Sequence, residues 1–501
     1  MLCAILLKLT FNKGAQFMLN KLKKEWLTAP GTNILAGIVV ALALIPEAIS
    51  FSIIAGVDPM VGLYASFIIA VVISLVGGRP AMISAATGAV ALVIVPLVRD
   101  HGIQYLLAAT ILMGIIQIIF GLLKIGRLMK FIPNSVMIGF VNALAIMIFM
   151  TQLKHIFGIS MPTYLFVIIT LLIIYLLPRV FNRIPAPLIA IVVLTIAYLV
   201  TGADVKTVGD LGEIKKSLPQ LIIPNVPFNM ETFKIIFPYA ISMAIVGLVE
   251  SLLTSRIVDQ ATDSYSNKNQ EARGQGIANF ITGFFGAMGG CAMIGQSVIN
   301  VRSGATTRLS TFTAGVFLII LIMVFGDWVV EIPMPILAGI MVMVSVGTFN
   351  WGSFKFIQKA PRSDAFVMIL TVVIVLFTSN LALGVIVGVI ISALCFATKI
   401  SNVSVQYEEQ NHHVYYKVKG QIFFVSIDSL MNQLDLEIRD QTIYLDFSQA
   451  HLWDDSAVNA IDTLIENYKK KNNMIYVKHL NKDSRKIVSE LSKVNQQQHL
   501  I

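Results

Sequence analysis

The sequence predicts a polytopic α-helical membrane protein, with about fourteen transmembrane segments in a seven-plus-seven inverted repeat and a small cytoplasmic α/β domain after them. Three observations predict it: the composition, a long succession of apolar segments, and a change of pattern after Lys399. The 501 residues are 56% hydrophobic and only 13% charged, with a mean hydropathy of +0.78. A soluble domain of average make-up has about 25% charged residues, so a soluble fold is excluded.

Apolar segments separated by short loops occupy residues 33–399, which we predict to be the membrane domain. The expected spans are 33–56, 59–77, 83–98, 104–123, 131–151, 163–178, 186–201, 233–255, 275–289, 291–301, 310–326, 333–349, 364–379 and 381–398. With the N-terminus inside, eighteen Lys and Arg residues fall in cytoplasmic loops and six in outer loops, as the positive-inside rule requires. We therefore expect a multi-pass protein of the cytoplasmic (plasma) membrane with both termini in the cytoplasm.

The two ends of the chain differ from the apolar part. Residues 1–32 are predicted to be a cytoplasmic N-terminal segment. Within it, residues 1–17 lack a small-residue cleavage site and read poorly as a signal peptide, and Met18 is the more natural start. Residues 405–501 alternate between strand-like and amphipathic helical patterns, which is typical of a small α/β domain.

Several function classes are excluded at this point. The basic residues are scattered, with no basic cluster interleaved with aromatics, which argues against a nucleic-acid partner. Cys3, Cys291 and Cys395 form no CxxC motif or Cys/His set, so neither a disulfide framework nor a zinc site is expected. The sequence offers no nucleophile–base pair and no phosphate-binding loop, and we expect neither an enzyme nor a bound cofactor.

Two short apolar segments point to a binding site. They are ISAATGAVALVIVP, Ile83–Pro96, and GGCAMIGQSVINVRSG, Gly289–Gly304. Each begins with small residues, then becomes helical, and they lie seven spans apart, so an inverted repeat would bring them face to face at the membrane midplane. The N-terminus of a half-helix exposes free N–H groups and a partial positive charge. The pattern favours an anion site between two such ends over small residues that only allow close helix packing.

Two acids lie within apolar spans. Glu47 directly follows Pro46 in the first span, and Glu250 lies in the span that opens the second repeat, with Thr254 on the same helix face. A carboxylate at the bilayer centre costs roughly 2.5–3.5 kcal/mol on insertion scales. We therefore expect each acid to have a role that offsets this cost. Each acid is expected either to carry a proton or cation or to bond to backbone that a broken helix exposes.

Amide side chains also fall in these spans. Gln296 follows the second half-helix and is a candidate to line the cavity, whereas Gln117, Asn142 and Gln152 are expected to form interhelical hydrogen bonds. Phe51 is a candidate cavity wall.

Five ordered motifs resemble the SulP family of inorganic anion transporters (solute carrier family twenty-six in animals), and the resemblance covers nearly the whole chain from about residue 20. The motifs are ALIPEAISFSIIAGVDPMVGLYASF, ISAATGAVALV, GLVESLLTSRIVD, RGQGIANFITGFFGAMGGCAMIGQSVINVRSGATTRLST and LDFSQAHLWDDSAVNAID. The resemblance implies a uracil-permease-like fold with core and gate domains, a C-terminal STAS domain and a homodimer.

The resemblance also implies where substrate and coupling ion bind. The substrate positions that carry over are Ala85, Ala86, Thr87, Gly88, Ala292, Met293, Ile294, Gly295 and Gln296. Glu47 takes the polar position after the first-span proline. Glu250 and Thr254 take the positions that bind Na⁺ in bicarbonate-transporting members. Because those members have Asp where this chain has the longer Glu250, we favour proton coupling.

The C-terminal motif departs from the STAS domains of anti-sigma-factor antagonists. Their Asp-Ser-Ser-Gly turn, which carries a regulatory phosphoserine, corresponds here to Asp455, Ser456, Ala457 and Val458. Since Ala457 replaces the second serine, a phosphoswitch of that type is not expected. Ser456 is the candidate regulatory residue, for phosphorylation or ligand contact, with capping of the following helix as its structural alternative.

We therefore expect a proton-coupled symporter that carries a small inorganic anion, sulfate first, by an elevator-type motion of the core domain against the gate domain. Its expected partners are the anion, H⁺ or Na⁺, the lipid bilayer and a second copy of the chain. The alternatives are a Na⁺-coupled bicarbonate or dicarboxylate transporter, an uncoupled anion channel, a nucleobase permease, and a membrane-anchored regulator that acts through its STAS domain.

Overall fold

The computed structural model describes residues 23, 25–126, 131–181, 185–212, 216–410 and 413–492. Residues 1–17, and most of the predicted N-terminal segment, therefore lie outside the described residues. The chain divides into two compact units, residues 1–389 and 390–501, and each is considered by itself below. Within the described residues, nine helices are long and apolar enough to cross a membrane by length and composition.

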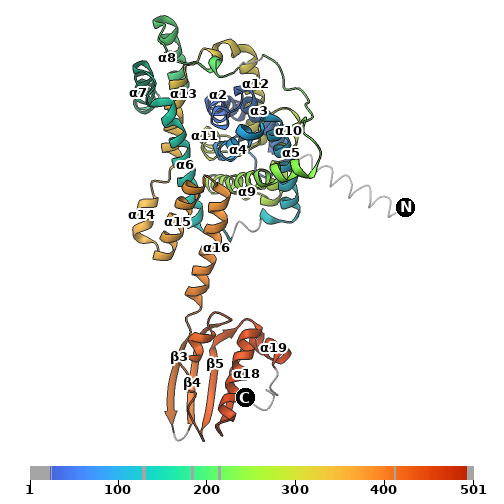
Figure 1. The fold of residues 1–501 in the computed structure, drawn as a ribbon, viewed down its shortest axis with the longest axis vertical. Helices are drawn as coiled ribbons and strands as arrows, with labels where there is room; N and C mark the ends of the chain where they lie inside the picture. Colours follow the sequence, from blue (N-terminus) through green and yellow to red (C-terminus); the bar gives the residue numbers. More distant parts are fainter. Residues whose placement is uncertain are drawn as a thin grey trace, which may run out of the picture. The chain divides into compact units, whose positions relative to one another are not determined.

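The first unit is almost entirely helical (Figure 1). In chain order its elements, up to the helix that crosses the boundary between the units, are α2 (Pro30–Ala55), α3 (Pro59–Val76), β1 (Ser84–Ala86), α4 (Gly88–His101), α5 (Ile103–Leu122), α6 (Asn134–Ile156), α7 (Met161–Leu176), η2 (Leu177–Arg179), α8 (Ala186–Thr201), η3 (Val208–Asp210), α9 (Met230–Ala261), α10 (Lys268–Phe284), β2 (Gly290–Ala292), α11 (Ile294–Arg302), α12 (Arg308–Val330), α13 (Met334–Thr348), α14 (Ser353–Lys359), α15 (Arg362–Thr378) and α16 (Leu381–Ile400).

A helix lies in each of the fourteen expected spans, but some boundaries differ. The span expected at 275–289 is the clearest case, because α10 begins at Lys268 and ends at Phe284. Its first turns carry the polar residues Glu271 and Gln275, which are fully buried against neighbouring elements rather than exposed to lipid. A hydropathy pattern predicts a loop at such polar turns, because it contains no information about the protein that surrounds them in the fold.

The helices form two bundles, which Figure 1 shows separately. We call α2–α5 and α9–α12 the core bundle, and α6–α8, α13 and α15 the gate bundle. In the core bundle α5 and α10 pack most extensively. Glycines allow this close approach: a Cβ added at Gly114 of α5 would lie 2.4 Å from the main-chain nitrogen of Phe280 in α10.

Six α-helices of the described residues have a side chain that caps their N-terminus: α3, α7, α9, α10, α18 and α19. Asp58 accepts a hydrogen bond from the Met60 N–H at the start of α3, and Asn229 accepts one from the Thr232 N–H at the start of α9. Asn267 accepts from two N–H groups at the start of α10. Asp and Asn are preferred at this position because their oxygens satisfy N–H groups that have no partner within the helix.

The second unit contains a four-stranded sheet with helices on one face (Figure 1). Its elements are β3 (Ser404–Gln410), β4 (His413–Ile422), α17 (Ile427–Met431), β5 (Thr442–Leu452), α18 (Asp455–Lys469), β6 (Met474–Lys478) and α19 (Lys482–Leu491). The strand order is β3-β4-β5-β6, with β3 antiparallel to β4 and the other pairs parallel. Alternate residues of β4 and β5 and the apolar face of α18 form its core.

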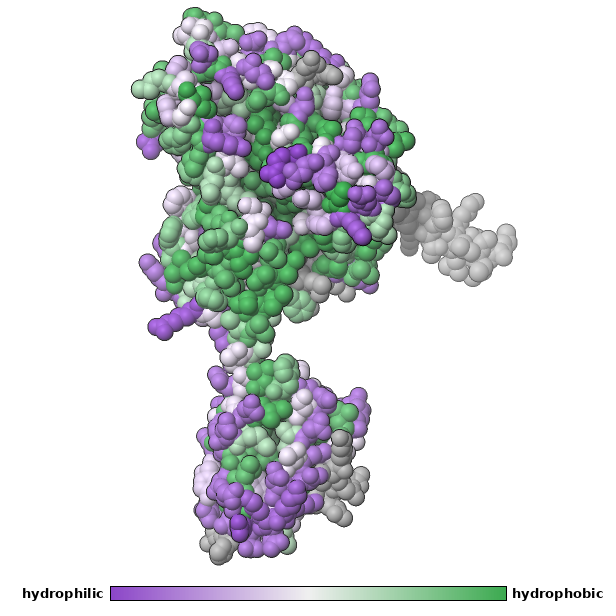
Figure 2. Space-filling view, in the orientation of Figure 1, coloured by the Kyte–Doolittle hydropathy of each residue, from purple (hydrophilic) through white to green (hydrophobic). Residues whose placement is uncertain are grey.

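The surface of the first unit carries many large apolar side chains. Figure 2 shows them gathered over a broad area of its exposed face. Phe325, Trp328 and Phe377 are among them, each more than half exposed. An apolar patch of this extent on a soluble protein would drive association, whereas hydrocarbon covers it in a bilayer.

Candidate functional site

The two half-helices meet as the inverted repeat predicts. Strands β1 and β2, which precede α4 and α11, pair antiparallel with Ala85 opposite Cys291. The pairing continues one step further, because the Met293 N–H donates to the Ile83 carbonyl oxygen at 2.9 Å. A strand pair that lies 200 residues apart in sequence thus brings the starts of two helices to one point.

Both helix N-termini are open at this point. Thr87 precedes α4 and Met293 precedes α11, and no side chain of the described residues caps either helix. The orphan N–H groups of the first turns therefore remain available. Together with the helix dipoles they make a positive environment without a buried lysine or arginine.

A cavity of about 80 Å³ lies where the two helices begin. It is lined by Glu47, Phe51, Thr87, Gly88, Ala89, Phe140, Val141, Leu144, Ile148, Glu250, Met293, Ile294, Gly295, Gln296, Val344 and Thr348. The two helix starts that border it suit a small inorganic anion. The core bundle contributes both half-helices and both acids, and α6 and α13 of the gate bundle form the other wall.

Glu47 is tied to the second half-helix. Its Oε1 accepts a hydrogen bond of 2.6 Å from Gln296 Nε2, and both side chains are buried, 8% and 2% exposed. In the part of the chain that the structure describes, the side chain of Glu47 forms no hydrogen bond to main chain, so the backbone alternative for this acid is not observed. Glu47 and Gln296 thus close one end of the cavity with a carboxylate and an amide.

Glu250 enters the cavity from α9 and contacts a residue that the sequence did not single out. Its Oε2 accepts from the Cys291 thiol at 3.0 Å, and the same sulfur lies 3.1 Å from Thr87 Oγ1. The Thr254 hydroxyl donates to the main-chain oxygens of Glu250 and Ala292, at 2.8 and 3.4 Å. Thr254 therefore holds backbone, while Cys291 contacts the acid.

The structure separates the predicted substrate residues into two groups. Glu47, Phe51, Thr87, Gly88, Met293, Ile294, Gly295 and Gln296 line the cavity, together with Glu250. Ala85, Ala86 and Ala292 lie behind it, buried in the paired strands. The lining residues of α6 and α13 are apolar except for Thr348, and their sequence carries no signal that distinguishes a cavity wall from helix packing.

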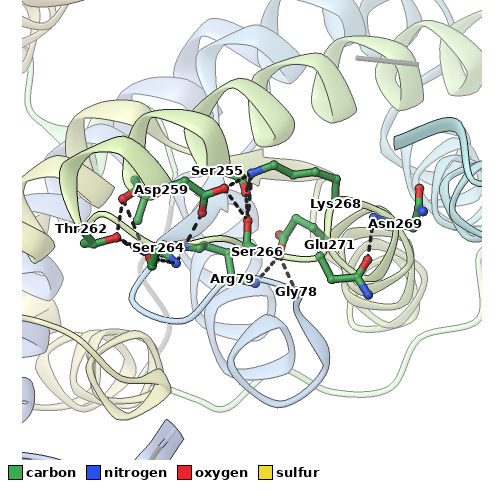
Figure 3. A network of polar contacts seen from close by, with 12 residues as sticks. Gly78, Arg79, Ser255, Asp259, Thr262, Ser264, Ser266, Lys268, Asn269 and Glu271 are labelled. Atoms are coloured by element: carbon green, nitrogen blue, oxygen red, sulfur yellow. Dashed lines mark hydrogen bonds and ion pairs between the residues drawn. The ribbon is translucent and has the colours of Figure 1, made fainter. Parts of the chain in front are cut away.

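A polar network supports the strand pair (Figure 3). Asp259 at the end of α9 accepts from Lys268 Nζ at 2.6 Å and lies 3.4 Å from Arg79 Nη1. Glu271 of α10 accepts from the main-chain N–H groups of Gly78 and Arg79, at 2.7 and 3.1 Å. Charges of both signs are paired here, so the loop before β1 is held by α9 and α10.

The Gln275 side chain connects this network to strand β1 of the site. Gln275 Nε2 donates to Glu271 Oε1 at 2.9 Å and to Ser84 Oγ, in β1, at 2.7 Å. On the other strand, Asn279 bonds both the N–H and the carbonyl of Gly290, at 2.9 and 3.0 Å. α10 therefore positions both strands through side chains on one face.

The three amides expected between helices bond different kinds of partner. Asn279 Nδ2 donates to Gln117 Oε1 at 2.8 Å, so Gln117 links two helices as predicted. Asn142 Oδ1 accepts at 2.8 Å from the N–H of Asn350, so Asn142 links α6 to the loop after α13 rather than to another helix. The Gln152 amide donates to Thr151 of its own helix.

The expected cap of α18 is corrected. Asp454, not Ser456, is the N-cap residue, and its Oδ1 accepts from the Ala457 N–H at 2.9 Å. Ser456 is the second residue of α18 and is partly exposed. Asp454 directly precedes the first residue of α18, and this is the position from which a side chain can accept from a first-turn N–H. Asp454 therefore has the capping role that was the structural alternative for Ser456.

Two further features bear on the choice of site. No cluster of three or more His, Cys, Asp or Glu that could hold a metal occurs within the described residues.

A larger cavity, of about 370 Å³, lies between α2, α8 and α12 and is lined almost wholly by apolar side chains such as Leu42, Phe325 and Trp328. Its wall offers no charged side chain, so it does not suit an anion.

The chain was compared with known families and proteins. Residues 31–171 and 159–371 match the sulfate permease family, and residues 404–496 match the STAS domain. A Bacillus subtilis (strain 168) protein named "Putative sulfate transporter YbaR" is 55% identical over 94% of this chain and 99% of its own length. The bicarbonate transporter BicA of Picosynechococcus is 27% identical over 74% of this chain and 70% of its own length.

Solved structures give the same architecture. The murine Slc26a9 anion transporter in its inward-facing state superimposes with a TM-score of 0.81 at 18% identity, covering 94% of this chain and 89% of that one. The transmembrane domain of BicA gives 0.62 at 27% identity, covering 72% and 96%. The predicted fold class, a polytopic helical membrane domain followed by a STAS domain, is confirmed.

Proposed function

Because this chain belongs to the sulfate permease family, we propose that it is a secondary active transporter that carries sulfate across the cytoplasmic membrane in symport with protons. The family is one of permeases, so the chain is not an enzyme. The observation that carries the proposal is the small cavity between two uncapped helix N-termini, with Glu47 and Glu250 in its wall.

Anion recognition rests on main-chain groups. The first-turn N–H groups of α4 and α11 offer hydrogen bonds to oxyanions, and the helix dipoles add to their attraction. Gly88 and Gly295 line the cavity at these positions, and a Cβ at Gly295 would meet no atom within 4 Å. The absent side chains let an anion approach the backbone closely.

Proton coupling follows from charge. Ionised Glu47 and Glu250 would repel an anion in the same small cavity, whereas the protonated acids would not. Anion binding therefore favours protonation, and protonation favours anion binding by the same factor, because linkage is reciprocal. The two species would cross together, so an inward proton gradient would drive uptake.

The movement that we propose is of the elevator type. Both half-helices, Glu47 and Glu250 belong to the core bundle, and the gate bundle supplies only apolar side chains and Thr348. A displacement of the core bundle along α6 and α13 would carry the anion without breaking its polar contacts. We also propose a homodimer, which light scattering of the purified protein would test.

The first experiment is uptake of labelled sulfate into proteoliposomes, with and without an inward proton gradient. Saturable uptake that the gradient stimulates is the expected result. Uptake that needs a Na⁺ gradient would contradict proton coupling, and uptake only of bicarbonate or a dicarboxylate would contradict the substrate. Current that does not saturate with sulfate would indicate a channel.

Two substitutions then test the acids. Glu47→Gln and Glu250→Gln keep the size of each side chain and remove its titration, so we expect uptake to lose its stimulation by the gradient. Glu231→Gln, on an exposed acid in the first turn of α9, is the matched control and should behave like the wild type. If both cavity variants kept gradient-driven uptake, the coupling roles would be wrong.

For the second unit we propose that Ser456 is a regulatory position. A phosphate there would lie in the first turn of α18, where the helix dipole stabilises negative charge. Ser456→Glu is expected to change the rate of uptake while Ser456→Ala does not. Equal rates in both variants would contradict a regulatory role.

A further inference from the structure

Cys291 takes a central place among the buried polar groups of the site, although it does not line the cavity. It lies in β2, opposite Ala85, and its side chain is completely buried. Its sulfur lies 3.0 Å from Glu250 Oε2 and 3.1 Å from Thr87 Oγ1. One thiol therefore joins the acid of α9 to the residue at the start of α4.

The direction of these bonds follows from counting hydrogens. A thiol has one hydrogen to donate, and the Cys291 S–H donates it to Glu250 Oε2. That oxygen can accept it in the ionised acid and also in the acid that carries its proton on Oε1. The Thr87 hydroxyl must then donate to the sulfur. The order is Thr87 to Cys291 to Glu250.

This order explains why α4 is uncapped. Thr is a preferred N-cap residue because its oxygen accepts from a first-turn N–H. Thr87 occupies that position with an extended backbone, yet its hydroxyl lies against Cys291, and no side-chain cap of α4 occurs in the described part of the chain. A capping hydroxyl would compete with an anion for the same N–H groups.

We propose that Cys291 is a positioning residue that keeps the Thr87 hydroxyl away from the α4 N-terminus and so leaves its N–H groups free for the anion. Through the same sulfur it orients Glu250. The inference rests on the proposed function, since it assigns Cys291 a part in anion affinity. It adds a residue to the site and a link between the anion-binding helix end and one of the two acids.

The surroundings of Cys291 make substitutions feasible. The strand on either side is held independently of the thiol, by Asn279 on Gly290 and by Ser251 Oγ, which accepts from the Ala292 N–H at 3.0 Å. Removing the sulfur therefore leaves the backbone of β2 in place.

The first test measures sulfate uptake by the full chain in proteoliposomes. We expect Cys291→Ala to raise KM about fivefold with a smaller change in the maximal rate, since a Thr cap is worth about 1 kcal/mol. Cys291→Ser keeps a donor and should stay close to the wild type. In the double variant Thr87→Val with Cys291→Ala, KM should return to that of Thr87→Val alone, because no hydroxyl remains to cap.

A purely structural role for Cys291 predicts other results. The serine variant would then be as impaired as the alanine variant, or the double variant would keep the raised KM. Either result overturns the proposal.

The second test does not depend on transport. In the full chain with Cys3→Ser and Cys395→Ser, the infrared S–H stretching band reports Cys291 alone. The expected band is that of a hydrogen-bonded thiol, and Glu250→Gln should shift it. A band typical of a free thiol, or one that Glu250→Gln leaves unmoved, overturns the inference. Absence of sulfate uptake by the wild type would instead count against the proposed substrate, and the band would still decide the role of Cys291.

Discussion

The pairing of β1 with β2 can be tested by a single methyl group at Gly290. A Cβ there would lie 2.0 Å from the carbonyl oxygen of Ala85 in the opposite strand. This is about 1.4 Å short of the 3.4 Å at which ordinary contacts begin. The obstacle is main chain and cannot rotate away, so Gly290→Ala must separate the strands and displace the helix N-termini that follow them.

The size of the effect follows from that displacement. Loss of one hydrogen bond to a charged group costs about 1.5–3 kcal/mol, and overpacking of a core costs roughly 1–3 kcal/mol. We therefore expect Gly290→Ala to weaken sulfate binding, and to lower uptake into proteoliposomes at low sulfate, by about 10- to 100-fold. The melting temperature of the protein in detergent should fall as well.

Gly295→Ala is the matched control, because a Cβ at Gly295 would meet no atom within 4 Å. It should keep the melting temperature of the wild type, although its methyl group enters the cavity and is expected to change KM. Wild-type uptake by Gly290→Ala would refute the reasoning, since the anion site would then not depend on the strand pair. A loss of thermal stability by Gly295→Ala equal to that of Gly290→Ala would also refute it.

Three further predictions concern stability. Glu271→Ala leaves two partly buried N–H groups of the loop before β1 without an acceptor, at up to about 1–3 kcal/mol each, and should lower the melting temperature below that of the exposed control Glu231→Ala. Asp454→Ala removes the cap of α18, worth about 1 kcal/mol, and should speed hydrogen exchange in its first turn, whereas unchanged exchange would contradict the assignment. Ser456→Ala should leave that exchange as it is. Gly114→Val would place its Cβ 2.4 Å from main chain of α10 and should prevent recovery of folded protein, and normal yield would argue against close α5–α10 packing.

Much of the fold was accessible from local pattern. Apolar segments long enough for a bilayer predicted the helices, and the strand–helix alternation after Lys399 predicted the second unit. The polar turns at the start of α10 were missed because their partners, such as Ser84, come from elsewhere in the chain. Strand β3 was missed as well. It is mostly exposed, so it lacks the alternation that burial imposes on β4.

Some features of the candidate site could likewise be predicted from the sequence, and others could not. The sequence by itself determined the two half-helices and the acids Glu47 and Glu250, because glycines, small residues and charges within apolar spans are costly and conspicuous. Only the tertiary structure decided that Gln296 bonds Glu47, that Cys291 joins Glu250 to Thr87, and that α6 and α13 close the cavity. The physical reason is that a charged residue within an apolar segment can be identified from the sequence alone, because its burial in the membrane is costly. A hydrogen-bond partner or an apolar wall becomes functional only through what the fold places beside it.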